Sequence, residues 1–162
     1  LLIIGKTEGH LDQSIFSRDI LNEKNGPPPE INLFNEKNNG ESLLKLIENN
    51  FIRSAHDVSL GGIITSLSKM CIKGKKGVTL KKSKYLINQF EYLFGEDQGR
   101  YIIEIEKDNL KKVTEILEKN SVHYDELGVV NENELFIDDQ SIVTIDELTK
   151  SHTNWLNKYI SK

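Results

Sequence analysis

Two short polar segments hold the residue types that could bind a ligand or take part in chemistry. The first reads Ser-Ala-His-Asp-Val-Ser-Leu-Gly-Gly at residues 54–62, and its candidates are His56, Asp57, Ser59, Gly61 and Gly62. A strand that runs into a helix here would place them beside the free N–H groups of the helix start, where an anion such as phosphate is favoured. In the alternative interpretation, Asp57 and Ser59 cap the helix and the glycines allow close packing. Spacing alone favours the cap.

The second polar segment, residues 93–100, reads Leu-Phe-Gly-Glu-Asp-Gln-Gly-Arg. Its candidates are Glu96, Asp97, Gln98 and Arg100, which offer two carboxylates, an amide and a guanidinium between glycines. Such a loop can bind amide, hydroxyl or phosphate groups. The same composition also fits a solvated turn, and the two interpretations stay open.

No catalytic residue and no metal site can be assigned from the residues alone. The histidines are widely spaced, at His10, His56, His123 and His152. Cys71 lies on an apolar helical face, where cysteine is usually part of the core. A Mg²⁺ ion could use Glu96 or Asp97, but neither a P-loop nor a dinucleotide fingerprint accompanies them. The sequence therefore shows no readable ATP site.

Hydrophobic periodicity predicts the elements that would position these segments. Apolar alternation predicts strands at residues 53–58 and 100–106, and a continuous apolar start predicts one at residues 1–6. A short strand is expected at residues 77–81, and a hairpin is expected from residues 123–130 and 134–137. Helical patterns begin near Gly40, Ser59, Leu86 and Asp108, and at Thr144 or Asp146. Alternating strands and helices predict an α/β (α+β) sandwich, in which a mixed β-sheet packs against helices.

The two polar segments should meet, because residues 53–58 and 100–106 are expected to be strands of one sheet and loops at strand ends present polar groups. We expect Asp57 to use much of its charge in capping the helix that begins near Ser59. Arg100 has no obvious local partner and is the better ligand candidate of the two.

Composition is that of an ordinary globular protein with one domain, residues 1–162. The net charge is −4, and no aromatic residues interleave with the lysines of residues 73–84, so no nucleic-acid partner is expected. These lysines fit a strand edge that is protected against further pairing. No apolar run approaches the roughly 20 residues of a membrane span, and one cysteine fits a reducing cytoplasm. The only methionine is Met70 and the chain opens inside an apolar run, so excision from a larger protein is expected.

Residues 53–62 and 93–101, taken in order, resemble the last domain of the synthetase subunit of phosphoribosylformylglycinamidine synthase, within the aminoimidazole ribonucleotide synthetase-related superfamily. Further similarity lies in the opening residues 2–7, in Pro27-Pro28 ahead of residues 31–33, in residues 128–130 and in Trp155-Leu156. Each piece is weak alone, and the ordered set at this spacing carries the resemblance.

The resemblance implies an ATP-dependent carbon–nitrogen ligase of de novo purine biosynthesis, which makes formylglycinamidine ribonucleotide from formylglycinamide ribonucleotide and ammonia. It implies that ATP and Mg²⁺ are bound mainly by ATP-binding domains upstream of this one. A glutaminase subunit and a small bridging subunit are the implied partners, in the cytoplasm, and this domain alone would be inactive. The alternatives are a small-metabolite kinase or hydrogenase-maturation protein of the same superfamily, or a non-catalytic binding or assembly module.

Overall fold

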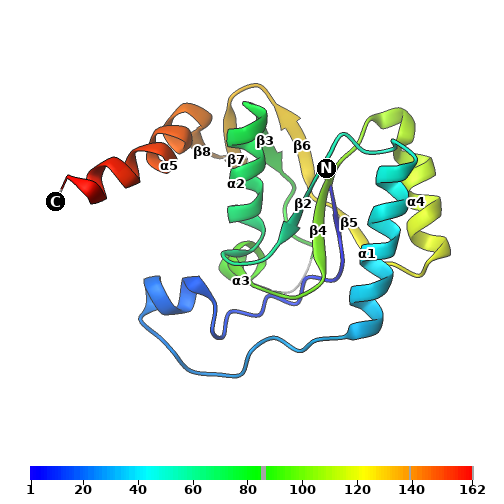
Figure 1. Ribbon diagram of the computed structural model, residues 1–162, viewed down its shortest axis with the longest axis horizontal. Coiled ribbons are helices and arrows are strands. Elements are labelled where there is room, and N and C mark those ends of the chain that lie inside the picture. The colour runs from blue at the N-terminus through cyan, green and yellow to red at the C-terminus, as the bar shows by residue number, and fades with distance from the viewer. Residues whose placement is uncertain (85–86, 139, 162) are drawn as a thin grey trace. The chain divides into compact units, whose positions relative to one another are not determined.

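The computed structural model describes residues 1–84, 87–138 and 140–161, and these form two compact units. Unit 1 comprises Leu1–Leu67 and Ser83–Glu126, and unit 2 comprises Ser68–Lys82 and Leu127–Lys162. Each unit contains a four-stranded sheet with helices, and Figure 1 labels most of these elements. The predicted α/β (α+β) architecture is confirmed. That residues 1–162 act as one domain stays a prediction.

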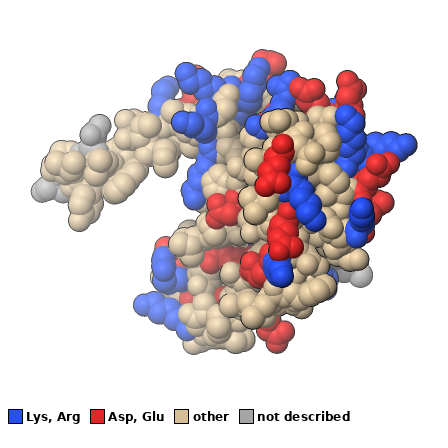
Figure 2. All heavy atoms as spheres, turned by 45° about the vertical axis from the view of Figure 1, so that its right-hand side comes forward, with Lys and Arg blue, Asp and Glu red and all other residues tan. Residues whose placement is uncertain are grey.

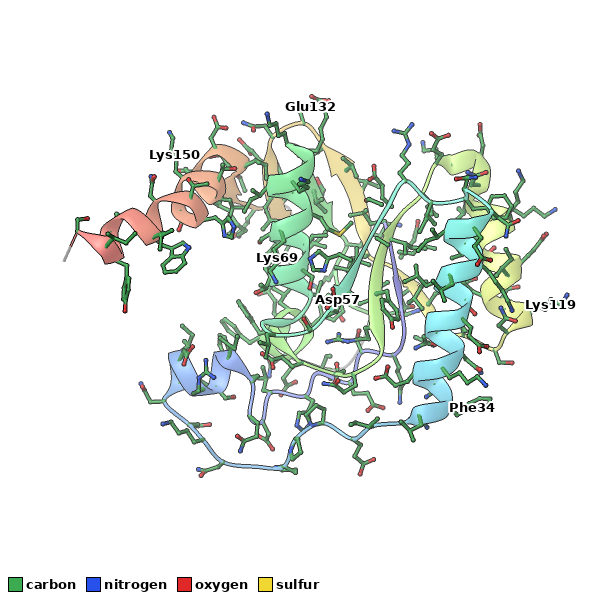
Figure 3. The ribbon with its side chains drawn as sticks, in the orientation of Figure 1. Phe34, Asp57, Lys69, Lys119, Glu132 and Lys150 are labelled. Atoms are coloured by element: carbon green, nitrogen blue, oxygen red, sulfur yellow. The ribbon has the colours of Figure 1, made fainter. Side chains whose placement is uncertain are left out.

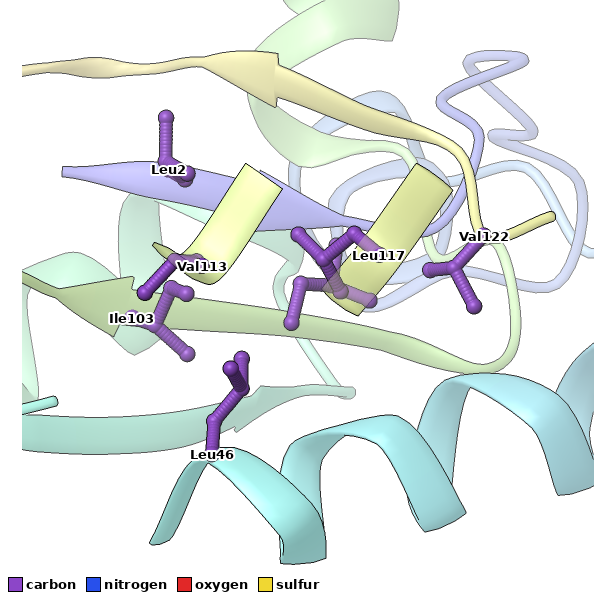
Figure 4. Close-up of a cluster of buried hydrophobic side chains, with 7 residues drawn as sticks. Leu2, Leu46, Ile103, Val113, Leu117 and Val122 are labelled. Carbon is purple, nitrogen blue, oxygen red and sulfur yellow. The ribbon is translucent and has the colours of Figure 1, made fainter. Parts of the chain in front are cut away.

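The sheet of unit 1 has the strand order β2-β4-β1-β5, and all neighbours are antiparallel. Its strands are β1 (Leu2–Ile4), β2 (Ser54–Val58), β4 (Arg100–Glu104) and β5 (Tyr124–Glu126). Two helices, α1 (Leu33–Glu48) and α4 (Leu110–Lys119), supply apolar side chains to one side of this sheet. Figure 4 shows the resulting cluster of buried residues, which consists of Leu2, Ile4, Leu46, Ile103, Val113, Leu117 and Val122.

Unit 1 also contains shorter helical elements. A short π-helix, η1 (Ser17–Leu21), and a 3₁₀ turn, η2 (Lys107–Asn109), join the longer elements. The helix α3 (Gln89–Phe94) begins with a capping box, in which Asn88 accepts from the Glu91 backbone N–H and the Glu91 side chain accepts in return. The helix α2 (Gly62–Gly74) begins in unit 1 and continues into unit 2.

The sheet of unit 2 has the strand order β6-β3-β7-β8 and is mixed. Its strands are β3 (Gly77–Leu80), β6 (Gly128–Asn131), β7 (Glu134–Ile137) and β8 (Gln140–Thr144), and the helix α5 (Ile145–Ile160) follows. The strand β3 pairs antiparallel with β6 and parallel with β7. The buried apolar residues of this unit include Cys71, Val78, Leu80, Leu127, Leu135 and Ile145.

Two expectations about unit 2 are wrong. Residues 123–130 and 134–137 do not form a hairpin, because β5 belongs to the other sheet and β3 lies between β6 and β7. The lysines near β3 do not mark a sheet edge, since β3 is paired on both sides. A local pattern cannot reveal that a strand from far earlier in the chain inserts between two consecutive strands.

The first long helix also begins earlier than its pattern indicated. Gly40 was expected near its start, whereas α1 begins at Leu33 and Asn32 caps it by accepting from the backbone N–H of Asn35 at 3.0 Å. Gly40 lies inside the helix, where an added Cβ would meet only the Tyr101 hydroxyl at 3.7 Å. The helix predicted from Leu86 is observed as α3 from Gln89, and Leu86 itself lies outside the described residues.

Candidate functional site

The two polar segments meet at adjacent strand ends, as predicted. In the β2–β4 pairing, Val58 lies opposite Arg100 and Asp57 lies opposite Tyr101. The residues that follow β2 therefore lie beside those that precede β4. The direct link is a hydrogen bond of 2.8 Å from the backbone N–H of Gly61 to the Glu96 carboxylate.

Glu96 is a buried carboxylate that joins three chain segments. Its Oε1 accepts hydrogen bonds from the backbone N–H of Gly61 at 2.8 Å and from that of Ile15 at 2.9 Å. Its own backbone N–H donates to the carbonyl of His10 at 2.8 Å. Gly61 has a φ of +81°, a conformation that costs glycine little, and this turns its N–H toward Glu96. The acceptor for the turn ahead of α2 therefore comes from the distant Glu96 side chain.

The expected cap by Asp57 is wrong. The Asp57 side chain is 63% exposed, and its Oδ1 lies 3.3 Å from Nδ1 of His56. Only the Asp57 backbone carbonyl contributes locally, by accepting from the Ser66 hydroxyl at 2.9 Å. Ser59 likewise contributes its carbonyl, to the N–H of Gly62 at 3.0 Å, and its side chain is exposed. Figure 3 shows Asp57 on β2, which stays extended through Val58 and so carries this side chain away from the helix start.

Asp97 holds the loop that follows β1. Its carboxylate accepts three backbone hydrogen bonds of 3.0 Å, from the N–H groups of Glu8, Gly9 and His10. Its Oδ2 also lies 3.4 Å from Nη1 of Arg100. Asp97 thus takes the place that a bound anion would take in a concave set of N–H groups.

Arg100 is buried and hydrogen-bonded within the protein, so the expectation that it lacks a local partner is wrong. The residue is 1% exposed. Its guanidinium donates to the carbonyl of Gly95 at 2.7 Å, to the carbonyl of Asp97 at 3.1 Å and to the hydroxyl of Thr7 at 3.2 Å. Because three donated bonds and a carboxylate compensate the charge, burial is tolerated. We call Thr7, Glu96, Asp97 and Arg100 the buried polar cluster.

The second glycine of the first segment is required by close packing. A Cβ on Gly62 would lie 2.7 Å from backbone atoms of Leu93, Phe94 and Gly95. Real Cβ atoms do not approach backbone this closely, so the start of α2 and the end of α3 can meet only at a glycine. Of the two interpretations of Gly62, the packed neighbour is the one that the contacts support.

A cleft of about 550 Å³ lies in unit 1 beside the buried polar cluster. Its walls come from residues 5–10, from residues 27–39, from the Asp97–Gly99 loop and from Ser121 and His123. Of the sequence-predicted candidates, only Asp97 and Gln98 line it. Gln98 is exposed, and its amide donates to the Glu96 carbonyl at 3.2 Å.

The charges of the cleft favour polar neutral or cationic groups. Its charged lining residues are Lys6, Glu8, Glu30, Glu36 and Asp97. The single lysine is paired with Glu8 at 2.6 Å, and this hydrogen bond raises the lysine pKa. A triphosphate does not fit here, because the carboxylates would repel it. Mg²⁺ does not fit Glu96 or Asp97, whose oxygens already accept backbone N–H groups, and within the described ranges no three His, Cys, Asp or Glu side chains gather as a metal site.

Sequence reasoning missed the residues of α1 that line the cleft. Asn35 and Asn39 lie four residues apart on one face of the helix, and Asn39 donates to the Gly99 carbonyl at 2.8 Å. Their helical spacing was a usable signal, which the late expected start of α1 concealed. Thr7 had no such signal, because only the fold brings it to Arg100.

Comparisons with known proteins fit this fold. The PurL subunit of phosphoribosylformylglycinamidine synthase from Pelagibacter ubique is 79% identical over 160 residues, which make up 99% of this chain and 22% of the relative. The PurL subunit from Bartonella bacilliformis is 39% identical, with the same coverage. The solved structure of T. maritima PurL complexed with FGAR has a TM-score of 0.73 at 20% identity, over 91% of this chain and 27% of that one, and this shows the fold. The chain spans about a fifth of the length of these curated relatives.

The family model described as "AIR synthase related protein, C-terminal domain" matches residues 1–139. This range contains both polar segments, the whole buried polar cluster and every strand up to β7. The chain belongs to the family of AIR synthase related proteins, as their C-terminal domain.

Proposed function

We propose that this chain is the C-terminal domain of the synthetase subunit of phosphoribosylformylglycinamidine synthase. The main support for this assignment is the 79% identity to a PurL subunit along almost the whole chain, which spans 22% of that relative. The complete polypeptide would be an ATP-dependent ligase that converts formylglycinamide ribonucleotide and ammonia to formylglycinamidine ribonucleotide. In that reaction ATP activates the substrate amide, and ammonia then forms the new carbon–nitrogen bond.

Within that ligase, the role proposed for this domain is to complete a site without performing chemistry. The buried polar cluster supports this role, because its carboxylates and guanidinium are engaged with one another and with backbone groups. The half-buried His56 and the exposed Asp57, Ser59 and Gln98 remain available to meet a neighbouring domain. ATP and Mg²⁺ are proposed to bind mainly to the upstream ATP-binding domains, since the cleft of this chain does not fit a triphosphate.

The proposed partners follow from the same assignment. They are the upstream domains of the same polypeptide, a glutaminase subunit that supplies ammonia and a small bridging subunit, all in the cytoplasm. One solved structure with this fold is PurLQS from Thermotoga maritima, and this supports an assembly of the synthetase with other subunits. Among the described residues, no helix is long and apolar enough to cross a membrane.

A domain exchange tests the proposal. In the Pelagibacter ubique PurL gene, the matching region is replaced by the sequence that encodes this chain. The chimera is then expressed in a bacterium that lacks its own synthetase gene. We expect growth without added purine, because the exchanged regions are 79% identical. A chimera with Gly62→Val is the matched control, and it should not rescue growth because its side chain would overlap the backbone of residues 93–95.

The chimera also separates the alternatives. Failure of a well-expressed, folded chimera to rescue growth would contradict the ligase assignment and favour a kinase or a maturation protein of the same family. The purified chain alone should neither hydrolyse ATP nor form the amidine. Turnover above that of a boiled sample would refute a purely site-completing role.

A further inference from the structure

The last helix of the chain carries an apolar face that is covered only at its beginning. Ile145, the first residue of α5, is 4% exposed, and Leu148 is half-buried. Farther along, Trp155 is 58% and Tyr159 is 73% exposed. The described side chains from Ser151 to the end of the helix are all exposed.

The exposed residues continue the face that is buried at the helix start. Positions 145, 148, 152, 155 and 159 follow one another at steps of three or four, which places them on one side of an α-helix. Leu156 and Ile160 widen this face, whereas Lys150 and Asn154 lie on the opposite side. We call Leu148, Trp155, Leu156, Tyr159 and Ile160 the α5 stripe. The face of α5 seen in Figure 2 carries few charged side chains.

The helix is well formed although its face is open. Thr144 and Glu147 make a capping box, in which the Glu147 N–H donates to the Thr144 hydroxyl and the Thr144 N–H donates to the Glu147 carboxylate. The rings of Trp155 and Tyr159 lie 6.4 Å apart, and thus form one continuous aromatic surface. Apolar surface of this kind, concentrated on one side of a helix, marks an interaction site.

The comparisons set the α5 stripe apart from the common domain. The family model ends at residue 139, before α5 begins. The PurL relatives, in contrast, align over 160 of the 162 residues and so include this helix. The helix that carries the stripe therefore lies outside the family model and inside the region shared with these relatives.

We propose that the α5 stripe docks onto an upstream domain of the same polypeptide. This inference rests on the proposed function. In the proposed ligase the ATP-binding domains lie upstream of this chain, which spans 22% of the length of a relative. The occupant is covalently attached, which raises its effective concentration to a level that a separate partner rarely reaches. Because the stripe carries no charge, the receiving surface is an apolar groove.

Hydrogen exchange of α5 amides, measured by mass spectrometry, tests the proposal. The full-length polypeptide is compared with the 162-residue chain. In the chain alone, residues 151–160 should exchange fast, because exposed helix ends open at little free-energy cost. In the full-length polypeptide, the same amides should exchange at about one tenth of that rate or below, since docking must be lost before they open.

Two double variants of the full-length polypeptide locate the contact. Trp155→Ser with Tyr159→Ser should return residues 151–160 to fast exchange and leave the amides of β1 and β4 protected. Lys150→Ser with Asn154→Ser, on the opposite side of the same helix, should leave the slow exchange unchanged. Slow exchange that persists in the stripe variant, or that is lost equally in both variants, would overturn the proposal.

The outcomes also distinguish the docking from the proposed function. Fast exchange in a full-length polypeptide that rescues purine-free growth would overturn docking and leave the ligase assignment intact. Slow exchange without rescue would support docking and contradict the assignment. Concentration-dependent slow exchange in the chain alone would identify a second copy as the occupant and overturn docking in cis.

Discussion

Removal of the Asp97 carboxylate should strongly destabilise the chain, while removal of the Asp57 carboxylate should not. Asp97→Ala leaves the backbone N–H groups of Glu8, Gly9 and His10 without their acceptor. It also leaves the buried guanidinium of Arg100 without its nearest carboxylate, at 3.4 Å. Asp57→Ala removes a side chain that is 63% exposed and forms an ion pair with the neighbouring His56.

The magnitude follows from these contacts. Leaving a buried donor unsatisfied costs about 1–3 kcal/mol, and removing one partner of a buried ion pair costs about 3–5 kcal/mol. The losses overlap, and water can reach the N–H of the exposed Glu8, so we expect about 4 kcal/mol in total. For a chain of this size that corresponds to a fall in Tm of about 8–16 °C. Asp57→Ala should change the free energy of unfolding by less than about 0.5 kcal/mol.

Thermal and urea unfolding of the 162-residue chain, followed by circular dichroism, measure both variants. Because a loss of about 4 kcal/mol is a large part of the usual 5–15 kcal/mol, Asp97→Asn is the second, milder variant. Its amide keeps one acceptor oxygen and most of the shape. An Asp57→Ala variant that melts as low as Asp97→Ala, or an Asp97→Ala variant that melts like the wild type, would refute the assignment of roles.

Three further predictions concern other parts of the chain. Gly62→Ala should cost at least about 2 kcal/mol, because its Cβ would overlap backbone of Leu93–Gly95, whereas Gly74→Ala, with open space around it, should be neutral or stabilising in urea unfolding. Burial raises the pKa of the Cys71 thiol to about 11 from 9.0, so a thiol reagent should react at pH 8 only on unfolding. By the same shift, the free energy of unfolding should fall between about pH 9 and 11, where the unfolded chain ionises first, and a Cys71→Ala variant should lack this fall. Thr144→Ala should destabilise α5 by about 1 kcal/mol, and faster hydrogen exchange in the first turn of that helix would check it.

Local patterns predicted the elements of unit 1 well. The alternation of residues 100–106 and the apolar start of the chain both correspond to observed strands, and β2 and β4 lie in one sheet as expected. The strand β1 is buried at all three positions, which agrees with its continuous apolar run, whereas half-buried positions interrupt the buried ones along β4. The two polar segments could be located for the same reason, since each adjoins a strand with a clear pattern.

The assignment of roles within the site could not be read from the sequence. Asp57 is next to a helix start in the chain, yet the carboxylate that reaches the Gly61 N–H belongs to Glu96. Arg100 appeared to lack a partner because two of its acceptors are the nearby backbone carbonyls of Gly95 and Asp97, which residue types do not reveal, and the third, Thr7, is more than ninety residues away. Hydrogen bonds between distant segments decide which polar residue is buried, and spacing along the chain carries no information about them.

The central position of β3 has a consequence for the order of folding. Val78 pairs with Val130 on one side and with Leu135 on the other, so both neighbours of β3 are synthesised long after it. Pairings between residues so far apart in sequence form slowly, because closing the long intervening loop costs conformational entropy before the stabilising contacts form. During synthesis, β3 therefore leaves the ribosome with both edges unpaired, before β6 and β7 have been made. Its lysine-rich flanks keep a strand in that condition from pairing with another nascent chain, a protection that matters before the sheet exists and not after it.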